Sequence, residues 1–587
     1  MADPTQTDVL FTPCRIGSVE IPNRIVMPPM TTRAADAEGF VTEDSIAYYR
    51  ARAEGGVGLI TVEMASPEKC GRHRHHELGL YKDEFISGLT RLVETIHAAG
   101  SKASIQLGHG GGHTRFDICG EKPIAPSAVP HPVYEMTLET IVPEEMSLPR
   151  IRQTIAAHAA AAARARHAGF DCLEIHAAHG YLISQFLTPF ENRRTDEYGG
   201  ALKNRARFGL EILDAVKYSV PGMPVIFRLS VDDYFPGGMT YEEGRQVALW
   251  AAEAGADALH IAAGHYRSLP SAARQIPPMA LPDATFLHYA ADIKKRVKIP
   301  VIAVGRLGDP AMARNAIASG KADFIALGRT LIADPQWPEK VRRGEAPCRC
   351  LACNTCVNEM RSGARLGCIV NGMAGNERRF EDAKPPRGER IAIIGAGPAG
   401  LTYASLVADK NTVTIFERDA TAGGAFRHTG KAPLFQEVEA DDRSFRLYIE
   451  SMVQACERRG VTFRYHLDVR TAPDLLAGFD RIVIATGARY PLGLGNLLMT
   501  LIDAGIARWP AIRDIASSSS FRNWFYYKLR RATGEHVRAL LSPDQKLCVI
   551  GDAATPGKSK EAIRSAFEAA LHDASTPRPT AQQRLPH

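Results

Sequence analysis

Four cysteines between positions 350 and 368 constrain this chain more than any other stretch of its sequence. The run reads Cys-Leu-Ala-Cys-Asn-Thr-Cys, and a fourth cysteine follows after eleven further residues. Thiolates are soft ligands, and such short spacings converge them on one centre, which is either a zinc ion or an iron–sulfur cluster. We predict Cys350, Cys353, Cys356 and Cys368 as the ligands, with Cys348 as the alternative to the first of them.

The surroundings of this run favour the cluster over zinc. A barrel-like pattern precedes the cysteines, and a strand with a dinucleotide-binding turn follows about twenty residues later. Between two units that each bind a redox cofactor, an electron relay is a better use of four thiolates than a structural ion. We therefore predict a [4Fe-4S] cluster segment over residues 346–384.

Length and composition exclude several classes of protein. A chain of 587 residues predicts two or three domains, and a net charge of +6 without a long Lys/Arg block argues against nucleic-acid binding. No apolar run is long enough to span a membrane, and the N-terminus lacks the features of a secretory signal. The remaining cysteines are scattered, so we expect a cytoplasmic protein. The densest basic patch, residues 72–76, is expected to be a solvated loop.

Residues 1–345 alternate short β-branched runs with amphipathic stretches. This alternation predicts an α/β protein whose N-terminal domain is a parallel (β/α)8 TIM barrel, with its chemistry at the carboxyl ends of the strands. The eight predicted strands are Ile25–Met27, Val57–Val62, Ala103–Gln106, Cys172–Ile175, Val225–Arg228, Ala258–Ile261, Val301–Val304 and Phe324–Leu327.

Two glycine–arginine pairs follow the last two strands. Gly305-Arg306 comes after the seventh strand, and Gly328-Arg329 comes after the eighth. Glycines let backbone N–H groups approach a phosphate, a helix N-terminus adds partial positive charge, and an arginine completes the site. The pairs predict a mononucleotide phosphate site.

The turn after the fourth strand carries the most specific motif. It reads His176-Ala-Ala-His179-Gly-Tyr181, and a polar stretch over residues 185–200 follows. Further matching residues end other strands: Pro28, Pro29, Met30, Gln106, His109 and Arg228. This set resembles the Old Yellow Enzyme family of flavoproteins. The cysteine run, together with the dinucleotide-binding unit that follows it, narrows the resemblance to the iron–sulfur branch of this family. That branch includes 2,4-dienoyl-CoA reductase, 2-enoate reductase and trimethylamine dehydrogenase.

The resemblance implies roles for these residues. FMN would bind without a covalent link, because Thr31 stands where amine dehydrogenases of the family carry a cysteine. The isoalloxazine would contact Gln106 and Arg228, with Pro29, Met30 and Thr31 against the ring.

The same resemblance implies how substrate would be handled. His176 and His179 would hold the oxygen of a substrate with a conjugated C=C, and Tyr181 would supply the proton. His265 lies close to where dienoyl-CoA reductases place a second acid.

A second nucleotide unit begins after the linker at residues 384–388. The strand at 390–394 leads into Gly395, Gly397 and Gly400, and Glu417 ends the next strand, which is a dinucleotide fingerprint. Gly424 and Asp552 complete the resemblance to an FAD domain over residues 388–487 and 546–574, which would hold FAD, or ADP alone.

Relatives insert an NAD(P)H unit before the last strand of this domain, whereas residues 488–545 show no second glycine fingerprint. We predict a shortened helical insert there, with helices at Leu497–Trp509 and Phe521–Arg531, and a disordered tail over residues 575–587. The insert would cap the FAD, dock a protein electron partner or lie on a membrane surface.

Together these features predict an oxidoreductase that reduces an activated C=C of an enoyl or enone substrate. Electrons would pass from NAD(P)H through FAD and the cluster to FMN. The alternative is an amine dehydrogenase or N-demethylase that passes electrons to a ferredoxin or an electron-transfer flavoprotein, because the two-residue gap between Cys353 and Cys356 resembles that type. We also expect a homo-oligomer.

Overall fold

The computed structural model describes residues 8–132, 140–431, 442–490 and 544–572, with shorter described stretches between 500 and 542. The chain forms two compact units. One comprises Met1–Gly367 and Ala374–Arg378, and the other comprises Cys368–Met373 and Arg379–His587. The predicted tail lies outside the described residues.

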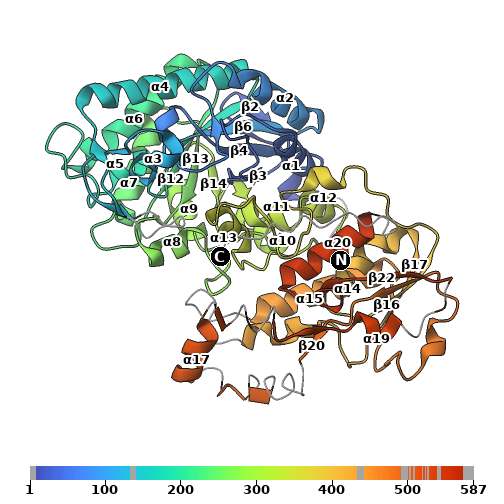
Figure 1. The fold of residues 1–587 in the computed structure, drawn as a ribbon. Coiled ribbons are helices and arrows are strands. Elements are labelled where there is room, and N and C mark those ends of the chain that lie inside the picture. The colour runs from blue at the N-terminus through green and yellow to red at the C-terminus, as the bar shows by residue number, and fades with distance from the viewer. Residues whose placement is uncertain are drawn as a thin grey trace. The chain divides into compact units, whose positions relative to one another are not determined.

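The first unit is a closed barrel of eight parallel strands, which confirms the predicted fold class (Figure 1). The barrel closes because β3 pairs with both β15 and β4. The strands are β3 (Ile25–Met27), β4 (Leu59–Ser66), β6 (Lys102–Leu107), β11 (Cys172–Ala177), β12 (Val225–Ser230), β13 (Ala258–Ala262), β14 (Val301–Ala303) and β15 (Phe324–Ala326). Every predicted strand of the barrel is present.

A hairpin closes the amino-terminal end of the barrel. Strands β1 (Cys14–Ile16) and β2 (Val19–Ile21) pair antiparallel, and their buried Ile16 and Ile21 pack with Leu59, Cys172 and other strand-starting residues. Burying this apolar surface stabilises the barrel and leaves its carboxyl end as the place for a binding site.

Helices surround the strands (Figure 1). Several begin at side chains that cap their free backbone N–H groups: Thr42 before α1, Ser147 before α4 and Thr240 before α7. The longer helices of this unit are α1 (Glu43–Ala53), α2 (Phe85–Ala98), α4 (Leu148–His167), α6 (Leu202–Ser219), α7 (Tyr241–Glu253), α9 (Leu287–Lys294) and α10 (Pro310–Ala318). The shorter ones are α3 (Phe116–Cys119), α5 (Leu182–Leu187), α8 (Leu269–Gln275), α11 (Gly328–Ala333), α12 (Trp337–Arg342) and α13 (Thr355–Arg361).

The first part of the cysteine segment packs against the loop that follows β3. Arg33 Nε donates to the carbonyl of Met360 at 2.6 Å, and the backbone N–H of Leu366 donates to the carbonyl of Thr32 at 3.1 Å. Beyond the cysteines, Glu377 forms a buried ion pair with Arg52 of α1, which joins this later part of the segment to the barrel unit. The segment that carries Cys350, Cys353 and Cys356 therefore lies at the carboxyl end of the barrel.

The second unit has a five-stranded parallel sheet in the order β18-β17-β16-β19-β22, a Rossmann-like arrangement. The strands are β16 (Arg390–Ile394), β17 (Thr412–Phe416), β18 (Thr462–Arg464), β19 (Arg481–Ile484) and β22 (Lys546–Val549). Helix α14 (Pro398–Val407) packs against α15 (Asp442–Arg458) and α20 (Ser559–Leu571).

The described part of residues 488–545 includes the antiparallel pair β20 (Ala488–Arg489) and β21 (Arg531–Ala532) and the helices α17 (Pro510–Ser517) and α19 (Gly534–Arg538). The two helices predicted for this stretch lie partly outside the described residues. The predicted end of the second is wrong, because residues 528–530 are not helical and Arg531 belongs to β21. Within the part of the chain that the structure describes, no helix combines the length and apolar character that crossing a membrane requires.

Candidate active site at the carboxyl end of the barrel

The turn after β11 gathers the three residues of the sequence motif. His176 ends the strand, His179 has φ +69°, Gly180 has φ +85°, and Tyr181 stands directly before α5. The ring centroids of His176 lie 5.1 Å from His179 and 4.9 Å from Tyr181. All three side chains are buried. The structure thus brings together the groups that were predicted to bind and protonate a substrate.

Burial sets the protonation states of these groups. It lowers the pKa of His176 and of His179 well below the ordinary value, and the nearby Arg228 guanidinium adds to the effect. It raises the pKa of the Tyr181 phenol well above its ordinary value. At neutral pH both imidazoles are therefore neutral and the phenol keeps its proton.

The residue beside the Tyr181 hydroxyl is His73, whose Nε2 lies 3.0 Å from Oη. The expectation of a solvated loop over residues 72–76 is wrong for three of its members, because Arg72, His73 and Arg74 are at most 5% exposed. Folding supplies partners for these side chains. The carboxylate of Glu77 lies 2.9 Å from His73 Nδ1, and the backbone carbonyls of residues 37 and 38 accept hydrogen bonds from Arg72. Only the sequence neighbours His75 and His76 are exposed.

Tyr266, and not His265, stands beside Tyr181. The two phenol ring centroids are 5.7 Å apart, His113 stacks on Tyr266 at 5.1 Å, and the Arg361 guanidinium lies 5.2 Å from the centre of the Tyr266 ring. Burial raises the pKa of Tyr266, but Arg361 and Arg74 outweigh it and hold that pKa below its ordinary value. The resemblance places the second acid near His265, and in the structure it is the adjacent Tyr266 whose ring faces Tyr181.

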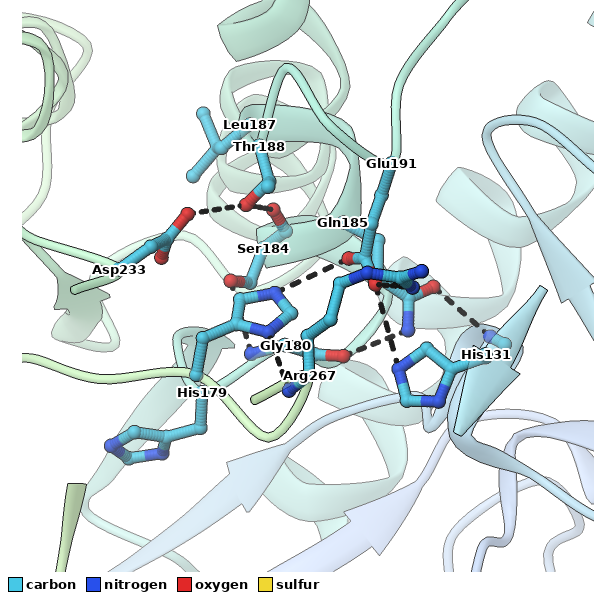
Figure 2. Close-up of polar contacts among 12 residues, drawn as sticks. His131, His179, Gly180, Ser184, Gln185, Leu187, Thr188, Glu191, Asp233 and Arg267 are labelled. Atoms are coloured by element: carbon cyan, nitrogen blue, oxygen red, sulfur yellow. Dashed lines mark hydrogen bonds and ion pairs between the residues drawn. The ribbon is translucent and has the colours of Figure 1, made fainter. Parts of the chain in front are cut away.

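His265 instead lies in a buried cluster behind the turn. Its Nε2 is 3.2 Å from Glu191 Oε2, and the other carboxylate oxygen lies 3.5 Å from His131 Nε2 and 3.1 Å from Arg267 Nη1. Figure 2 shows Glu191 between His131 and Arg267. Burial opposes the charge on Glu191, but the two imidazoles and the guanidinium prevail and lower its pKa to about 2. Burial lowers the pKa of His265, yet the carboxylates of Glu191 and Asp233 raise it above the ordinary value.

This cluster fixes the backbone of the turn. The N–H of Tyr266 donates to the carbonyl of His179 at 3.2 Å, and residues 179 and 265 form a parallel bridge. A Cβ on Gly180 would lie 2.5 Å from His265 Cε1. Gly180 is therefore required both by its positive φ and by the imidazole packed against it.

The predicted flavin contacts at β6 and β12 share one buried carboxylate. Gln106 Nε2 donates to Glu174 Oε1 at 2.7 Å, Arg228 Nη1 lies 3.7 Å from the same oxygen, and His260 Nδ1 lies 2.8 Å from Glu174 Oε2. Arg228 Nε and His176 Nδ1 are buried and meet no hydrogen-bond partner among the described residues. Donors left unsatisfied in this way fit the polar edge of an isoalloxazine and a substrate oxygen.

Pro29, Met30 and Thr31 lie in the loop after β3, and the next residue, Thr32, contacts a buried acid that was not predicted from the sequence. Glu63, on β4, accepts from the backbone N–H of Thr32 at 2.8 Å and from its hydroxyl at 2.5 Å. Burial raises the Glu63 pKa to about 7 in spite of these hydrogen bonds. Glu63 is the only charged residue of β4, so the sequence did not indicate that it binds Thr32.

Gly305 of the predicted phosphate site has a backbone conformation that favours glycine, but the arginine side chains of the site have other partners. Gly305 has φ +108° and Arg306 has φ +59°. The Arg306 guanidinium pairs with Asp283 at 2.8 Å, and Arg329 donates to the side chain of Asn354 and, at 2.7 Å, to the carbonyl of Pro277. A phosphate here would be held first by backbone N–H groups.

Three of the four predicted ligand sulfurs take part in short-range hydrogen bonds. The N–H of Ala352 donates to Cys350 Sγ at 3.4 Å, whereas Cys353 Sγ donates to the hydroxyl oxygen of Thr355 at 3.3 Å. In the second unit, the N–H of Val370 donates to Cys368 Sγ at 3.4 Å. Hydrogen bonds from N–H groups stabilise thiolates that bind a metal centre.

One other cluster in the barrel has the elements of a metal site. A ligand atom from each of Glu68, Cys70 and His109 lies within 4.8 Å of the others. However, Arg150 donates to Glu68 Oε1 at 2.9 Å and to Cys70 Sγ at 3.2 Å, and the N–H of Gly111 donates to His109 Nδ1 at 3.0 Å. Nε2 of His109 then carries the proton, so the cluster is an ion-pair network.

In the second unit the glycine turn has the geometry of a dinucleotide site. Gly395 has φ +107°, a Cβ on Gly397 would meet open space, and one on Gly400 would clash with the carbonyl of Gly395. Glu417 accepts from the N–H of Ala396 at 2.7 Å and is buried. The turn leaves room for a pyrophosphate next to the start of α14.

Two further predicted residues lie in this unit. Gly424 has φ +48°, and a Cβ there would lie 3.1 Å from the Cα of Gly397. Asp552 is engaged by the chain itself, because Arg530 Nη1 donates to one carboxylate oxygen at 2.5 Å and the N–H of Gly557 to the other at 3.0 Å. A ribityl contact would share that carboxylate with Arg530.

Comparison with known proteins agrees with this geometry. The family described as NADH:flavin oxidoreductase / NADH oxidase matches residues 9–347, and the NAD(P)-binding Rossmann-like domain matches residues 393–441. NADH oxidase of Thermoanaerobacter brockii is 38% identical over 488 residues, which cover 82% of this chain and 73% of the relative. Cinnamate reductase of Clostridium sporogenes is 33% identical over 509 residues, covering 82% of this chain and 74% of the relative.

A solved structure of a 2-naphthoyl-CoA reductase in complex with 2-naphthoyl-CoA has the same fold. It superposes with a TM-score of 0.84 at 24% identity and covers 96% of this chain and 99% of its own. The chain therefore belongs to the NADH:flavin oxidoreductase / NADH oxidase family, among the iron–sulfur flavoproteins of Old Yellow Enzyme type, and is a flavin-dependent oxidoreductase.

Proposed function

We propose that the barrel binds FMN at its carboxyl end and reduces the C=C of an α,β-unsaturated carboxylate or related enoyl compound. The observation that carries this proposal is the meeting of His176, His179 and Tyr181 within about 5 Å at the end of β11. The similarity to a protein named cinnamate reductase supports the carboxylate as substrate class.

Within this site the chain's own residues polarise and protonate the substrate. FMN, when bound, supplies the hydride. The neutral imidazoles of His176 and His179 donate to the substrate oxygen and draw electron density from the double bond, and Tyr181 delivers a proton to the α-carbon. The Arg228 guanidinium would supply positive charge to balance the negative charge of a reduced flavin.

FMN would be held by Pro29, Met30, Thr31, Gln106 and Arg228 around its ring. Its phosphate would lie at Gly305, Arg306, Gly328 and Arg329. The buried, unsatisfied Arg228 Nε supports this assignment.

Electrons would reach the barrel from the second unit. The glycine turn and Glu417 would hold FAD, or ADP alone, and Cys350, Cys353, Cys356 and Cys368 would hold a [4Fe-4S] cluster that carries electrons from FAD to FMN. The alternative, an amine dehydrogenase that passes electrons to a protein acceptor, is favoured by the gap of two residues between Cys353 and Cys356.

Anaerobic titration separates the two directions. For the reductase we expect NAD(P)H to bleach the flavin and an α,β-unsaturated carboxylate such as cinnamate to restore its colour. Bleaching by methylated amines, with no response to nicotinamides or enoates, would contradict the reductase. Metal analysis of oxygen-protected protein should find iron, and zinc in its place would rule out the electron relay.

A further inference from the structure

The hydroxyl of Tyr181 faces a histidine that belongs to the loop after β4. His73 Nε2 lies 3.0 Å from Tyr181 Oη, and both side chains are buried. Their rings meet edge to face, with centroids 4.8 Å apart. A phenol that gives a proton to substrate becomes a phenolate, and in this site an imidazole is within reach to restore the proton.

Glu77 holds this imidazole from its far side. Its Oε2 lies 2.9 Å from His73 Nδ1, at an angle that departs from that of an ideal hydrogen bond, and it accepts from the backbone N–H groups of His73 and Arg74 at 2.8 and 3.0 Å. Burial raises the Glu77 pKa, but His73 and these donors outweigh it and keep that pKa below its ordinary value. The carboxylate is therefore ionised and can stabilise a positively charged imidazole.

Arg74 determines which nitrogen of His73 carries a proton at rest. Its Nε donates to His73 Nε2 at 2.8 Å, so Nε2 has a lone pair and Nδ1 bears the hydrogen. The Tyr181 hydroxyl faces the same lone pair, so the hydrogen bond from Arg74 must be released before Nε2 takes up a proton. The order carboxylate, imidazole, hydroxyl is that of a hydrolase triad, in which the carboxylate orients the ring and the ring moves the proton.

We propose that Glu77, His73 and Tyr181 form a proton relay for the reduction, in which His73 reprotonates Tyr181 and Glu77 is a positioning residue. This inference rests on the proposed function. When the substrate is reduced, the O–H bond of Tyr181 breaks and a C–H bond forms at the α-carbon. Arg74 then releases its hydrogen bond to His73 Nε2, and a solvent proton is taken up at that nitrogen. This proton passes to the phenolate, after which Tyr181, His73 and Arg74 return to their starting states.

Other charged and titratable groups face the relay, and a pH profile must take account of them. Around His73 and Glu77 these are Arg72, Arg74, His113 and Glu63. Tyr181 also faces His176, Tyr266 and Arg74. The test therefore compares variants of the relay with one another, and does not assign a pKa from one curve.

The experiment is single-turnover reoxidation of the dithionite-reduced holoenzyme by cinnamate and, separately, by ferricyanide, which accepts electrons and needs no proton from Tyr181. His73→Gln should slow the cinnamate reaction about 10- to 100-fold, shift its pH profile and enlarge its solvent isotope effect, and Glu77→Gln should have a smaller effect in the same direction. Ferricyanide rates and flavin content should be unchanged. His75→Asn, an exposed neighbour on the same loop, is the matched control and should behave as the wild type.

The outcomes separate this inference from the proposed function. If Tyr181→Phe is slow with cinnamate while both His73→Gln and Glu77→Gln match the wild type, the relay is wrong and the reductase stands. If neither cinnamate nor another enoate reoxidises the wild-type enzyme, both the relay and the proposed reductase function are wrong. Equal slowing of the cinnamate and ferricyanide reactions in both variants would show a structural role and also overturn the relay.

Discussion

On one side of the turn after β11, Tyr181 reaches His73 and Glu77; on the other, His265 reaches Glu191, His131 and Arg267. Both sides pair a buried histidine with a buried carboxylate. On the first side the pair ends at the Tyr181 phenol, which is the proposed proton donor. On the second, the imidazole packs against Gly180 and the pair ends in a guanidinium.

The difference teaches that proximity to a catalytic turn does not by itself assign chemistry to a histidine. In the proposed relay His73 exchanges a proton with Tyr181, whereas His265 packs against the backbone of the turn that carries Tyr181. Variants on the two sides should therefore fail in different ways: the first in proton transfer, the second in stability.

The largest effect is expected at Tyr181. Tyr181→Phe removes the proton donor while keeping the ring, and should slow enoate reduction about 10²- to 10⁴-fold with FMN retained. Stopped-flow reoxidation measures this loss. An unchanged rate would show that Tyr181 is not the proton donor. The pair of His73 and Glu77 would then have no proposed part in proton transfer.

The next largest effect is steric and is expected at Gly180, against which His265 packs. Gly180→Ala should lower the free energy of unfolding by about 3 kcal/mol, because its Cβ would lie 2.5 Å from His265 and its φ is +85°. Gly200→Ala is the matched control, since Gly200 has φ +74° with open space around it, and should cost about 1 kcal/mol. Urea denaturation measures both, and equal losses would show that His265 does not fix the turn.

A smaller loss is expected from the ion pair itself. Glu191→Gln should destabilise the protein by about 2 kcal/mol, because it leaves His265, His131 and Arg267 around a neutral amide in a buried place. The cinnamate and ferricyanide reactions of the reduced enzyme should change by the same factor. If only the rate with cinnamate fell, His265 would take part in proton transfer. The proposed difference between His73 and His265 would then be wrong.

The smallest effect is the pH dependence of that stabilisation. His265 has a raised pKa, so its contribution is complete below the unfolded value of about 6.5 and is lost as pH rises through the folded value. Glu191 has a pKa of about 2, so its contribution is complete above about 4.3 and is lost as pH falls.

The stability difference between wild type and Glu191→Gln should therefore be greatest between about pH 4.3 and 6.5 and change by on the order of 1 kcal/mol outside that window. Thermal unfolding across a pH series measures it. A difference that grows steadily above pH 6.5 would contradict the assigned charges.

Sequence reasoning found what is local in the chain. The eight barrel strands and the glycine turn at Gly395 follow from short-range patterns, and His176, His179 and Tyr181 lie within six positions of one another. These features need no knowledge of tertiary contacts.

What the sequence could not show depends on loops that meet only in the fold. His73 and Glu77 lie in a run rich in Arg and His, which reads as a charged surface until folding buries it against Tyr181. The one available signal was an acid four residues after His73. Similarly, whether His265 or Tyr266 faces Tyr181 depends on the twist of a strand end, which residue types do not specify.

The most direct test of the account is a single turnover of the anaerobically reduced enzyme with cinnamate, in which flavin oxidation and saturated product are measured together. The account predicts that the flavin is reoxidised as the saturated acid forms, one molecule for each pair of electrons lost. Reoxidation by ferricyanide alone, with no saturated product from any enoate, would contradict it.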